Sequence, residues 1–420
     1  MKIVIFCSDN KNTRKAKKSF RLKKKQKQKQ KQKNKFKSYK KKDSVNKNDT
    51  NSLKLDENIL KFFNLNSKNI WKNNSKVIQL TKDFNLFDNS DKVFGTLLNL
   101  IQNARKNHEF LILNYKEGNN LVGALYFIDT FCWEIAKSKC WSLKLNNLPS
   151  IETEILTNLK SFKTNTSENK YTYIVNNKIK INRSDDKLAR QEHIVKSKEI
   201  RDLIERGLRD SQKDNSLELT YPQHTAIDSA ISEHFDNILL HAPTAQYGHL
   251  CGIFDKINKI ATIMIYNFGK TISETLNDNK LPDYVEKFKD EIISNHTKQK
   301  FFSIKNEFNR ENALTLLAIQ EGISSVLSDD ISRGHGLIDF IEHCFELSSD
   351  SQITLISGQT VIKIDNKYRI SQMKVLGRDR RILAFNKEND IFMKPDKDYV
   401  KNAKYIFPGV IIETRIPLNI

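Results

Sequence analysis

The chain has 420 residues, of which 38% are hydrophobic and 29% are charged, and its formal net charge at pH 7 is +21. This length predicts two or three domains, at roughly 100–200 residues for each domain. Its 5 cysteines are scattered without a CxxC pair, which argues against a disulfide framework and a structural zinc site. No apolar run reaches the roughly 18 residues of a membrane span, so the composition predicts a cytoplasmic protein.

The basic charge is concentrated in one segment near the N-terminus. Lys11 to Lys42 contains 18 Lys or Arg and no acid, and removing these 18 charges from +21 leaves +3 for the rest of the chain. Such a run repels itself and lacks apolar surface to bury, so residues 1–50 are predicted to be a disordered tail. Two interpretations stay open: weak, salt-dependent contact of the tail with nucleic acid or another acidic surface, and the codon bias of an AT-rich genome.

Short apolar strands alternate with helical patterns over residues 51–163. Three strands and two helices are predicted: Val77–Leu80, Phe110–Tyr115 and Trp141–Leu145 as strands, and Val93–Ala104 and Leu121–Lys137 as helices. Strands that alternate with helices are typical of a small α/β domain.

Residues 164–194 are rich in Asn, Lys and Ser, and we expect a linker there that contains a hairpin around Asn176-Asn177. From about residue 195 the pattern is helical as far as SEHFDNILLHA at Ser232–Ala242. A predicted strand at Lys259–Asn267 then ends in FGKTI, and a long polar segment with one helix at about Glu311–Leu327 follows. RGHGLIDFIEHCFEL is read as a Gly turn that opens a helix, and ITLISG, TVIKI and VIIETRIPL as closing strands.

Three polar residues, Glu233, Asn237 and His241, recur at every fourth position of SEHFDNILLHA. This spacing places a carboxylate, an amide and an imidazole on one face of a helix. Taken alone, the stripe is compatible with chance, and a structural role for His241 stays open beside a functional one.

The order of the motifs resembles the ATP-binding fold of the gyrase, Hsp90, histidine kinase and MutL superfamily (GHKL) over residues 195–420. A helix with Glu-x-x-x-Asn comes first, then a strand ending in x-x-Gly, a variable segment, Gly-x-Gly-Leu before a helix, and closing strands. EHFDNILLHA, EGISS, SRGHGL, ISGQT and FPGVIIETRIPL together resemble bacterial ATPase domains that follow a STAS-like domain. The resemblance implies an α/β protein: a two-layer GHKL-type domain with a mixed sheet, after a small STAS-like α/β domain (51–163) and the basic tail.

The resemblance implies ATP and Mg²⁺ as ligands. Asn237 matches the family residue that ligates Mg²⁺, an ion that needs few protein ligands when waters and phosphates supply the rest. Glu233, one turn earlier, matches the residue that polarises the attacking water or accepts a proton, and it is the predicted catalytic residue.

The strand end IYNFGKTI resembles the second family motif, with departures. Asn267 stands where the family has the Asp that accepts a hydrogen bond from the adenine amino group, and its amide keeps a carbonyl acceptor. Gly269 is retained, whereas Thr271 stands where a second Gly is common.

By the same resemblance, Gly334 and Gly336 flank the phosphates at the N-terminus of the next helix. Arg333 is predicted to contact the terminal phosphate, and an exposed Arg without a role is the alternative. The segment Ile272–Ser332 is expected to be a mobile nucleotide lid.

Three functions follow as hypotheses. The first is an Mg-ATP-binding conformational switch or slow ATPase in bacterial regulation, and the second is a serine protein kinase of the anti-sigma-factor type acting on a STAS-type partner. The third is a nucleic-acid-binding protein that works through the Lys-rich tail. A histidine kinase is disfavoured, because His193 lies too close to Asn237 to leave room for a dimerisation hairpin. A regulatory protein partner and a homodimer both stay open.

Overall fold

The computed structural model describes residues 57–69, 77–80, 84–105, 110–115, 122–138, 142–146, 154–155, 172–180, 186–210, 219–225, 227–229, 231–232, 247–278, 281–297, 308–323, 336–375 and 377–418. The Lys-rich segment, predicted to be disordered, lies outside these residues. Over the described part, the chain is a mixed α/β protein with three sheets.

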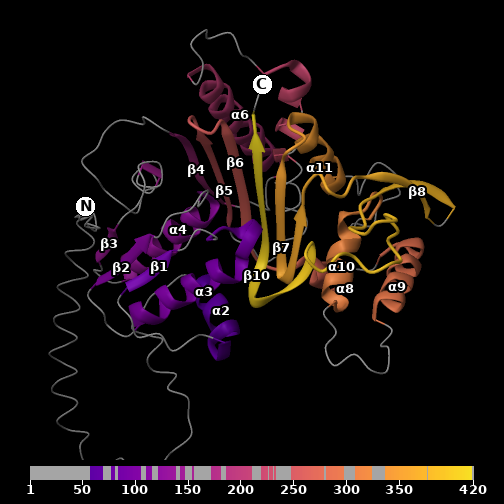
Figure 1. The fold of residues 1–420 in the computed structure, drawn as a ribbon, viewed down its shortest axis with the longest axis horizontal. Helices are drawn as coiled ribbons and strands as arrows, with labels where there is room; N and C mark the ends of the chain where they lie inside the picture. Colours follow the sequence, from indigo (N-terminus) through magenta and orange to yellow (C-terminus); the bar gives the residue numbers. More distant parts are fainter. Residues whose placement is uncertain are drawn as a thin grey trace, which may run out of the picture.

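The largest sheet has five strands in the order β4-β5-β6-β10-β7, and every neighbouring pair is antiparallel (Figure 1). The strands are β4 (Thr172–Lys180), β5 (Tyr247–Asp255), β6 (Ile260–Phe268), β7 (Gln352–Ile364) and β10 (Val400–Pro417). The predicted mixed sheet is therefore wrong. Each strand runs against its neighbours because the chain enters neighbouring strands from opposite ends of the sheet.

Two strands of this sheet differ from the prediction. Residues 172–180 form the single strand β4, which pairs with β5, where we expected a hairpin within a linker. The strand β5 was not predicted at all, because Gly248, His249 and Gly252 weaken its β-propensity.

A smaller, parallel sheet has the order β1-β2-β3, with strands β1 (Val77–Leu80), β2 (Phe110–Tyr115) and β3 (Ser142–Asn146). Its strands are connected by α3 (Leu86–Arg105) and α4 (Val122–Ser138), so the predicted alternation of strands and helices is confirmed. The helix α3 starts earlier than predicted and is kinked at Asn89, which has φ −149° and ψ 70°.

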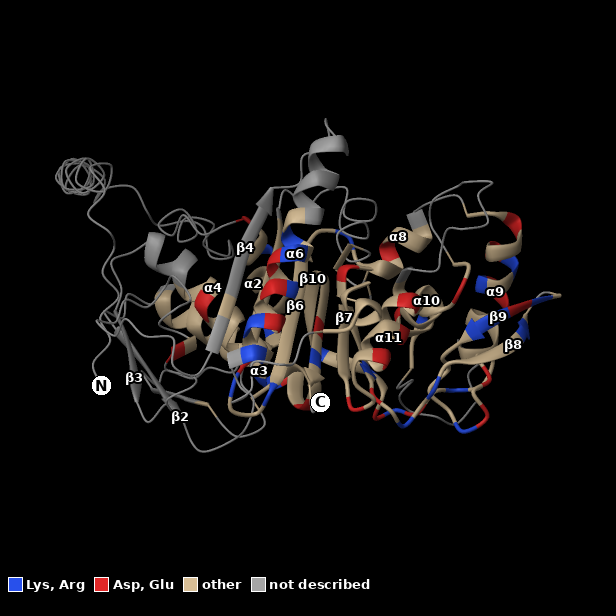
Figure 2. Ribbon diagram, turned by 90° about the horizontal axis from the view of Figure 1, so that it is seen from above, with Lys and Arg blue, Asp and Glu red and all other residues tan. Residues whose placement is uncertain are grey.

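Helices cover both faces of the five-stranded sheet (Figure 2). The helices α2 (Glu57–Asn66), α3 and α4 lie between the two larger sheets. The other face carries α6 (Asp186–Asp210), the helical turns at 221–232, α10 (Arg310–Ile319) and α11 (Gly336–Leu347).

The strand β6 shows how the two faces divide. Met264, Tyr266 and Phe268 belong to the hydrophobic cluster with α2, α3 and α4. Ile263 and Ile265 belong to the cluster with α6 and the helical turns at 221–232. This alternation follows from the two-residue period of a strand, and it assigns every other side chain of β6 to one face.

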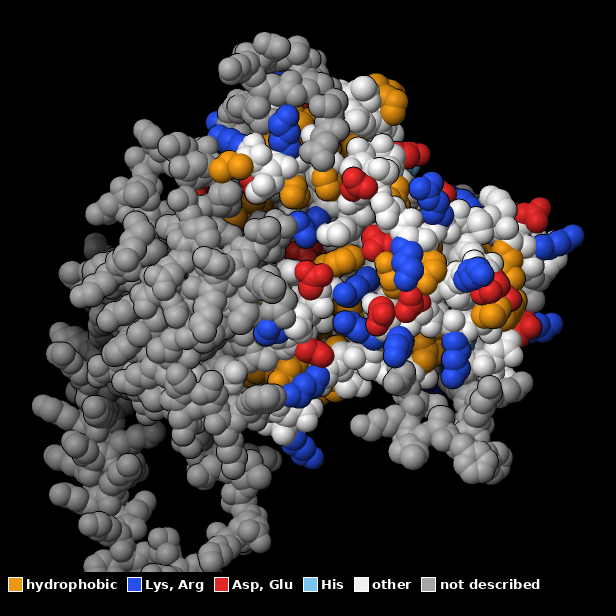
Figure 3. Space-filling model, in the orientation of Figure 1, with side chains coloured by type: hydrophobic (Ala, Val, Ile, Leu, Met, Phe, Trp, Pro, Cys, Tyr) orange, Lys and Arg blue, Asp and Glu red, His pale blue; other side chains and the backbone are white. Residues whose placement is uncertain are grey.

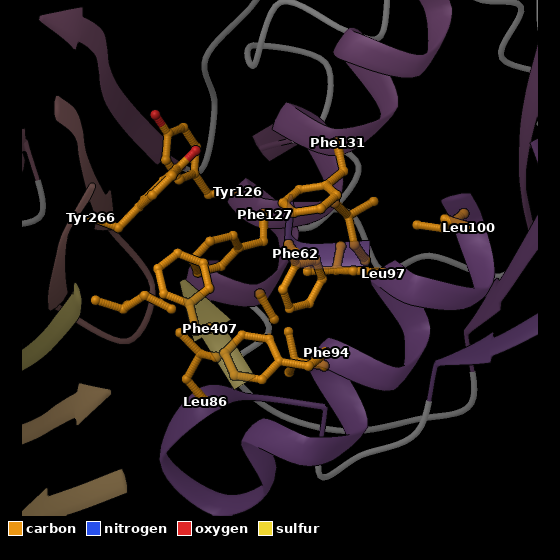
Figure 4. Close-up of a cluster of buried hydrophobic side chains, with 14 of the residues drawn as sticks. Phe62, Leu86, Phe94, Leu97, Leu100, Tyr126, Phe127, Phe131, Tyr266 and Phe407 are labelled. Carbon is orange, nitrogen blue, oxygen red and sulfur yellow. The ribbon is translucent and has the colours of Figure 1, made fainter. Parts of the chain in front are cut away.

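Aromatic rings fill the layer between the N-terminal helices and the sheet (Figure 4). Phe62 of α2 lies edge-on to Phe94 of α3 and Phe131 of α4, and Phe94 stacks on Phe407 of β10. One continuous core therefore joins the segment predicted as a separate domain (51–163) to the five-stranded sheet.

A buried amide adds hydrogen bonds to this contact. Asn66, fully buried at the end of α2, donates from Nδ2 to the Ile406 carbonyl and accepts from the Ile406 N–H, both at 2.8 Å. The side chain thus pairs with the backbone of β10 as a neighbouring strand would.

The segment Ile272–Ser332 contains three helices in its described part, where we expected a mobile lid. These are α8 (Ile272–Asp278), α9 (Asp283–Thr297) and α10, and they share a core with β7 and β10. The helix α10 ends at Ile319 rather than at the predicted Leu327, because its C-cap, Gln320, already has an extended backbone with φ −74° and ψ 150°.

Between β7 and β10 the chain forms a two-stranded hairpin, β8 (Ser371–Val375) and β9 (Arg378–Ile382). Acidic and basic side chains are interspersed over the described part of the face shown in Figure 3. No helix among the described residues is long and apolar enough to cross a membrane.

Candidate functional site

Asn267 lies at the end of β6, a central strand of the large sheet. It pairs with Gly248 of β5 and Val410 of β10, and the strand alternation places its side chain on the same face as Ile263 and Ile265. The side chain is only 3% exposed, yet its Nδ2 has no hydrogen-bond partner among the described residues. A buried amide without a partner costs free energy, so this atom indicates a place where a ligand or water binds.

The chain then turns into α8 through a capping box formed by Thr271 and Glu274. Thr271 Oγ1 accepts from the Glu274 N–H at 3.1 Å, and the Thr271 N–H donates to Glu274 Oε2 at 2.7 Å. The next N–H, of Ile272, donates to Ser357 Oγ of β7 at 2.8 Å. Thr271 therefore starts a helix, and these three backbone donors are satisfied within the chain.

Two glycines leave room for close contacts around the end of β6. Gly409 has a φ of +153°, and a Cβ at this position would overlap the Asn267 carbonyl oxygen. Gly358, with a φ of +60°, leaves room for the Glu311 carboxylate, which accepts from the Gln359 N–H at 2.9 Å. Burial raises the pKa of Glu311, and the Gln359 hydrogen bond partly offsets this rise.

The helix α11 packs on β10 near its C-terminal end. There Cys344 is hydrogen bonded to Thr414 of β10, and β7 then starts at Gln352 beside Arg415. The first turn of α11 contacts β9, where Asp339 pairs with Arg381.

Arg381 of β9 holds together the end of α10 and the first turns of α11. Its guanidinium bonds Glu321 at 3.1 Å, Asp339 at 2.7 Å, and Glu342. Burial lowers the pKa of Arg381, and the hydrogen bonds to the three carboxylates outweigh burial and raise it above the usual value. We call these four residues the Arg381 cluster.

On the opposite face of the sheet, Glu413 of β10 is buried against α4, with an exposed fraction of 3%. It accepts from the Gly123 N–H, and a Cβ at Gly123 would overlap its Oε1. Its Oε2 has no hydrogen-bond partner among the described residues. Burial raises the pKa of Glu413 to about 7, while Arg415 lowers it, Asp88 raises it and the Gly123 N–H lowers it.

The predicted site residues fall into two groups. Asn267 and Gly269 lie at the end of β6, where the Gly269 N–H donates to the Pro408 carbonyl at 3.0 Å, and Gly336 is the first residue of α11. Five others lie outside the described residues: Glu233, Asn237, His241, Arg333 and Gly334.

The helical turns at 221–232 pack beside the site. Ile227 and Ile231 belong to one cluster with Leu250 of β5 and its partner Ile265 of β6. No group of three or more His, Cys, Asp or Glu side chains among the described residues is arranged to hold a metal ion.

Sequence reasoning missed several residues of this region. The capping box could have been found, because Thr271-x-x-Glu274 has the usual spacing of that motif. Ser357 has no local signal, since its partner Ile272 lies 85 residues away in the chain. The Arg381 cluster has none either, because its residues come from β9, the end of α10 and α11.

Comparisons of the chain with protein-family models and with curated proteins find no match.

Proposed function

We propose that this protein binds Mg-ATP in a GHKL-type domain and acts as an ATP-dependent conformational switch or slow ATPase. The observation that carries the proposal is Asn267, whose buried amide lies at the strand end where the family reads the adenine base. The start of α11 at Gly336 would suit the phosphates, since a helix N-terminus offers N–H donors and a positive dipole end to them.

The roles of the remaining residues come from the resemblance. Asn237 would ligate Mg²⁺ through its amide oxygen, and Glu233 would polarise the attacking water. Gly334 and Gly336 would allow the phosphates to approach the backbone, and Arg333 would pair with the terminal phosphate. The bound Mg²⁺ would supply charge neutralisation of the phosphates.

The position of the N-terminal unit, residues 51–163, favours a switch over a kinase that acts on a separate STAS-type partner. Its helices pack on the face of the sheet opposite Asn267, and neighbouring residues of β6 face the two layers. A shift of β6 on nucleotide binding would therefore move Tyr266 against Phe127, whose ring centroid lies 4.7 Å away. Under this proposal the STAS-like unit is the part that responds to the nucleotide.

The test is calorimetric titration of Mg-ATP into the full chain and into Asn237→Ala. We expect saturable binding by the wild type and a loss of at least about tenfold in the variant, because a lost metal ligand weakens the hold on the phosphates. The variant should unfold at the wild-type temperature. A folded wild-type chain that binds no nucleotide would contradict the proposal, and transfer of the γ-phosphate to a protein would change it to a kinase.

A further inference from the structure

We propose that Asn267 makes the nucleotide site permissive for the purine base, so that the protein binds guanine nucleotides as well as adenine nucleotides. The inference rests on the proposed function and adds to it the class of base.

The chemistry of the side chain at this position decides what it can read. Adenine carries an amino group, a donor, at the carbon where guanine carries an oxygen, an acceptor. An ionised Asp offers only acceptors, so it pairs with the adenine amino group and repels the guanine oxygen. Asn offers one acceptor and two donors, and a rotation by about 180° exchanges the two ends of its amide.

The surroundings of Asn267 leave the donor end of its amide available. Its backbone neighbours are the paired strands β5 and β10, and the residues beside it, Gly248 and Val410, have no side-chain donor or acceptor. Because no described residue accepts from Nδ2, this end of the amide can donate to a ligand. With adenine, Oδ1 would accept from the amino group, and with guanine, Nδ2 would donate to the oxygen.

Hydrogen-bond energies predict a small difference between ATP and GTP binding in the wild type, and a large preference for ATP when a carboxylate replaces the Asn267 amide. Both purines can form hydrogen bonds of similar, neutral strength with the amide, each contributing about 1 kcal/mol. A site that leaves a buried polar group unpaired rejects the wrong ligand much more strongly, by about 10⁴-fold in favourable cases. The dissociation constants of ATP and GTP should therefore lie within about tenfold of each other in the wild type.

The experiment is titration of Mg-ATP and of Mg-GTP into the full-length wild type, Asn267→Asp and Asn64→Asp. Asn64→Asp makes the same chemical change at an exposed position of α2, and it should leave both constants unchanged. We expect Asn267→Asp to shift the ratio of the two constants by at least about 100-fold in favour of ATP.

Each outcome decides the matter. Comparable ATP and GTP binding by the wild type, together with the shift in Asn267→Asp, supports the inference. A wild type that binds ATP at least 100-fold more tightly than GTP overturns it and leaves the proposed function standing. A folded wild type that binds neither nucleotide overturns both.

A buried carboxylate can prevent folding, so Asn267→Ala provides the same test without a charge. Removal of both the donor and the acceptor should weaken ATP and GTP by the same factor, about tenfold. Weaker binding of ATP alone would overturn the inference, because it would mean that the amide reads only adenine.

Discussion

Glu413 is a carboxylate of the interior strand β10, and its buried position makes the stability of the protein depend on pH. Its pKa in the folded protein is about 7, against 4.5 for an ordinary Glu. Between these pH values the folded protein holds a proton that the unfolded chain has lost, so the free energy of unfolding falls as the pH rises. The loss over this window is about 3 kcal/mol.

We predict that Glu413→Gln removes this part of the pH dependence. Urea unfolding of the full chain at pH 5, 6, 7 and 8 measures it, with Glu388→Gln as the matched control at an exposed position. The stability of Glu413→Gln should fall less between pH 5 and 7 than that of the wild type and the control. Equal slopes in all three proteins would mean that Glu413 is charged at pH 5.

Single residues could be predicted from the sequence where a local motif contained them. Asn267 and Gly269 were predicted from the motif at the strand end, and both lie there. Glu413 could not be found in this way, because its environment is created by Gly123, which is 290 positions away in the chain. The pairing of a carboxylate with a glycine on another element leaves no mark in either local sequence.

The hairpin β8–β9 fixes α11 through the Arg381 cluster, and this contact also accounts for the position of Gly336. Arg381→Gln would leave the carboxylates of Glu321, Asp339 and Glu342 facing one another without a cation. We expect a loss of about 2 kcal/mol in the free energy of unfolding, between the values for exposed and buried pairs.

Salt distinguishes this effect from a loss of packing. Salt screens the repulsion between carboxylates, and the screening length falls from about 14 Å at 0.05 M NaCl to about 4 Å at 0.5 M. The free energy of unfolding of Arg381→Gln should therefore recover partly as NaCl is raised over this range. Arg378→Gln on the same strand is the control, because its guanidinium lies over the Tyr284 ring rather than among carboxylates. A loss that salt does not reduce would show that Arg381 acts through packing.

Elements with a strong local pattern were predicted well. The strands at Val77–Leu80 and Phe110–Tyr115 have the predicted bounds, and the helix after RGHG is α11. The pair ITLISG and TVIKI forms one strand, β7, because Gly358 continues the strand through an irregular register. The helices α8 and α9 were missed, since their sequences are polar and their buried residues are recognised only from the tertiary core.

For the whole molecule, composition and motif order separate residues 51–163 from 195–420, and the described residues of both segments share one core. Sequence patterns identify which face of an element is apolar, but they do not tell which other element covers it.

The shared core predicts that residues 195–420 cannot fold alone. Without α2, α3 and α4, the side chains of Met264, Tyr266, Phe268 and Phe407 would be exposed on one side of the sheet. Each aromatic ring alone buries about 150–250 Å², so the exposed patch would exceed what monomeric proteins tolerate.

We expect this fragment to aggregate and to lose cooperative unfolding, as measured by gel filtration and thermal denaturation. A chain that lacks only residues 1–50 should behave like the full chain in both measurements. A monodisperse fragment with the melting temperature of the full chain would contradict the shared core.

The place of β10 in the sheet also determines when the protein can fold during synthesis. This strand follows the other four strands of the sheet in the chain, yet it lies between β6 and β7, and it supplies the backbone that Asn66 of α2 binds, 340 positions earlier. Until β10 is synthesised, β6 and β7 have no strand between them, and Asn66 lacks its partner. Such long-range contacts make folding slow, and the nascent chain must keep the apolar surfaces made before β10 from aggregating until this strand arrives.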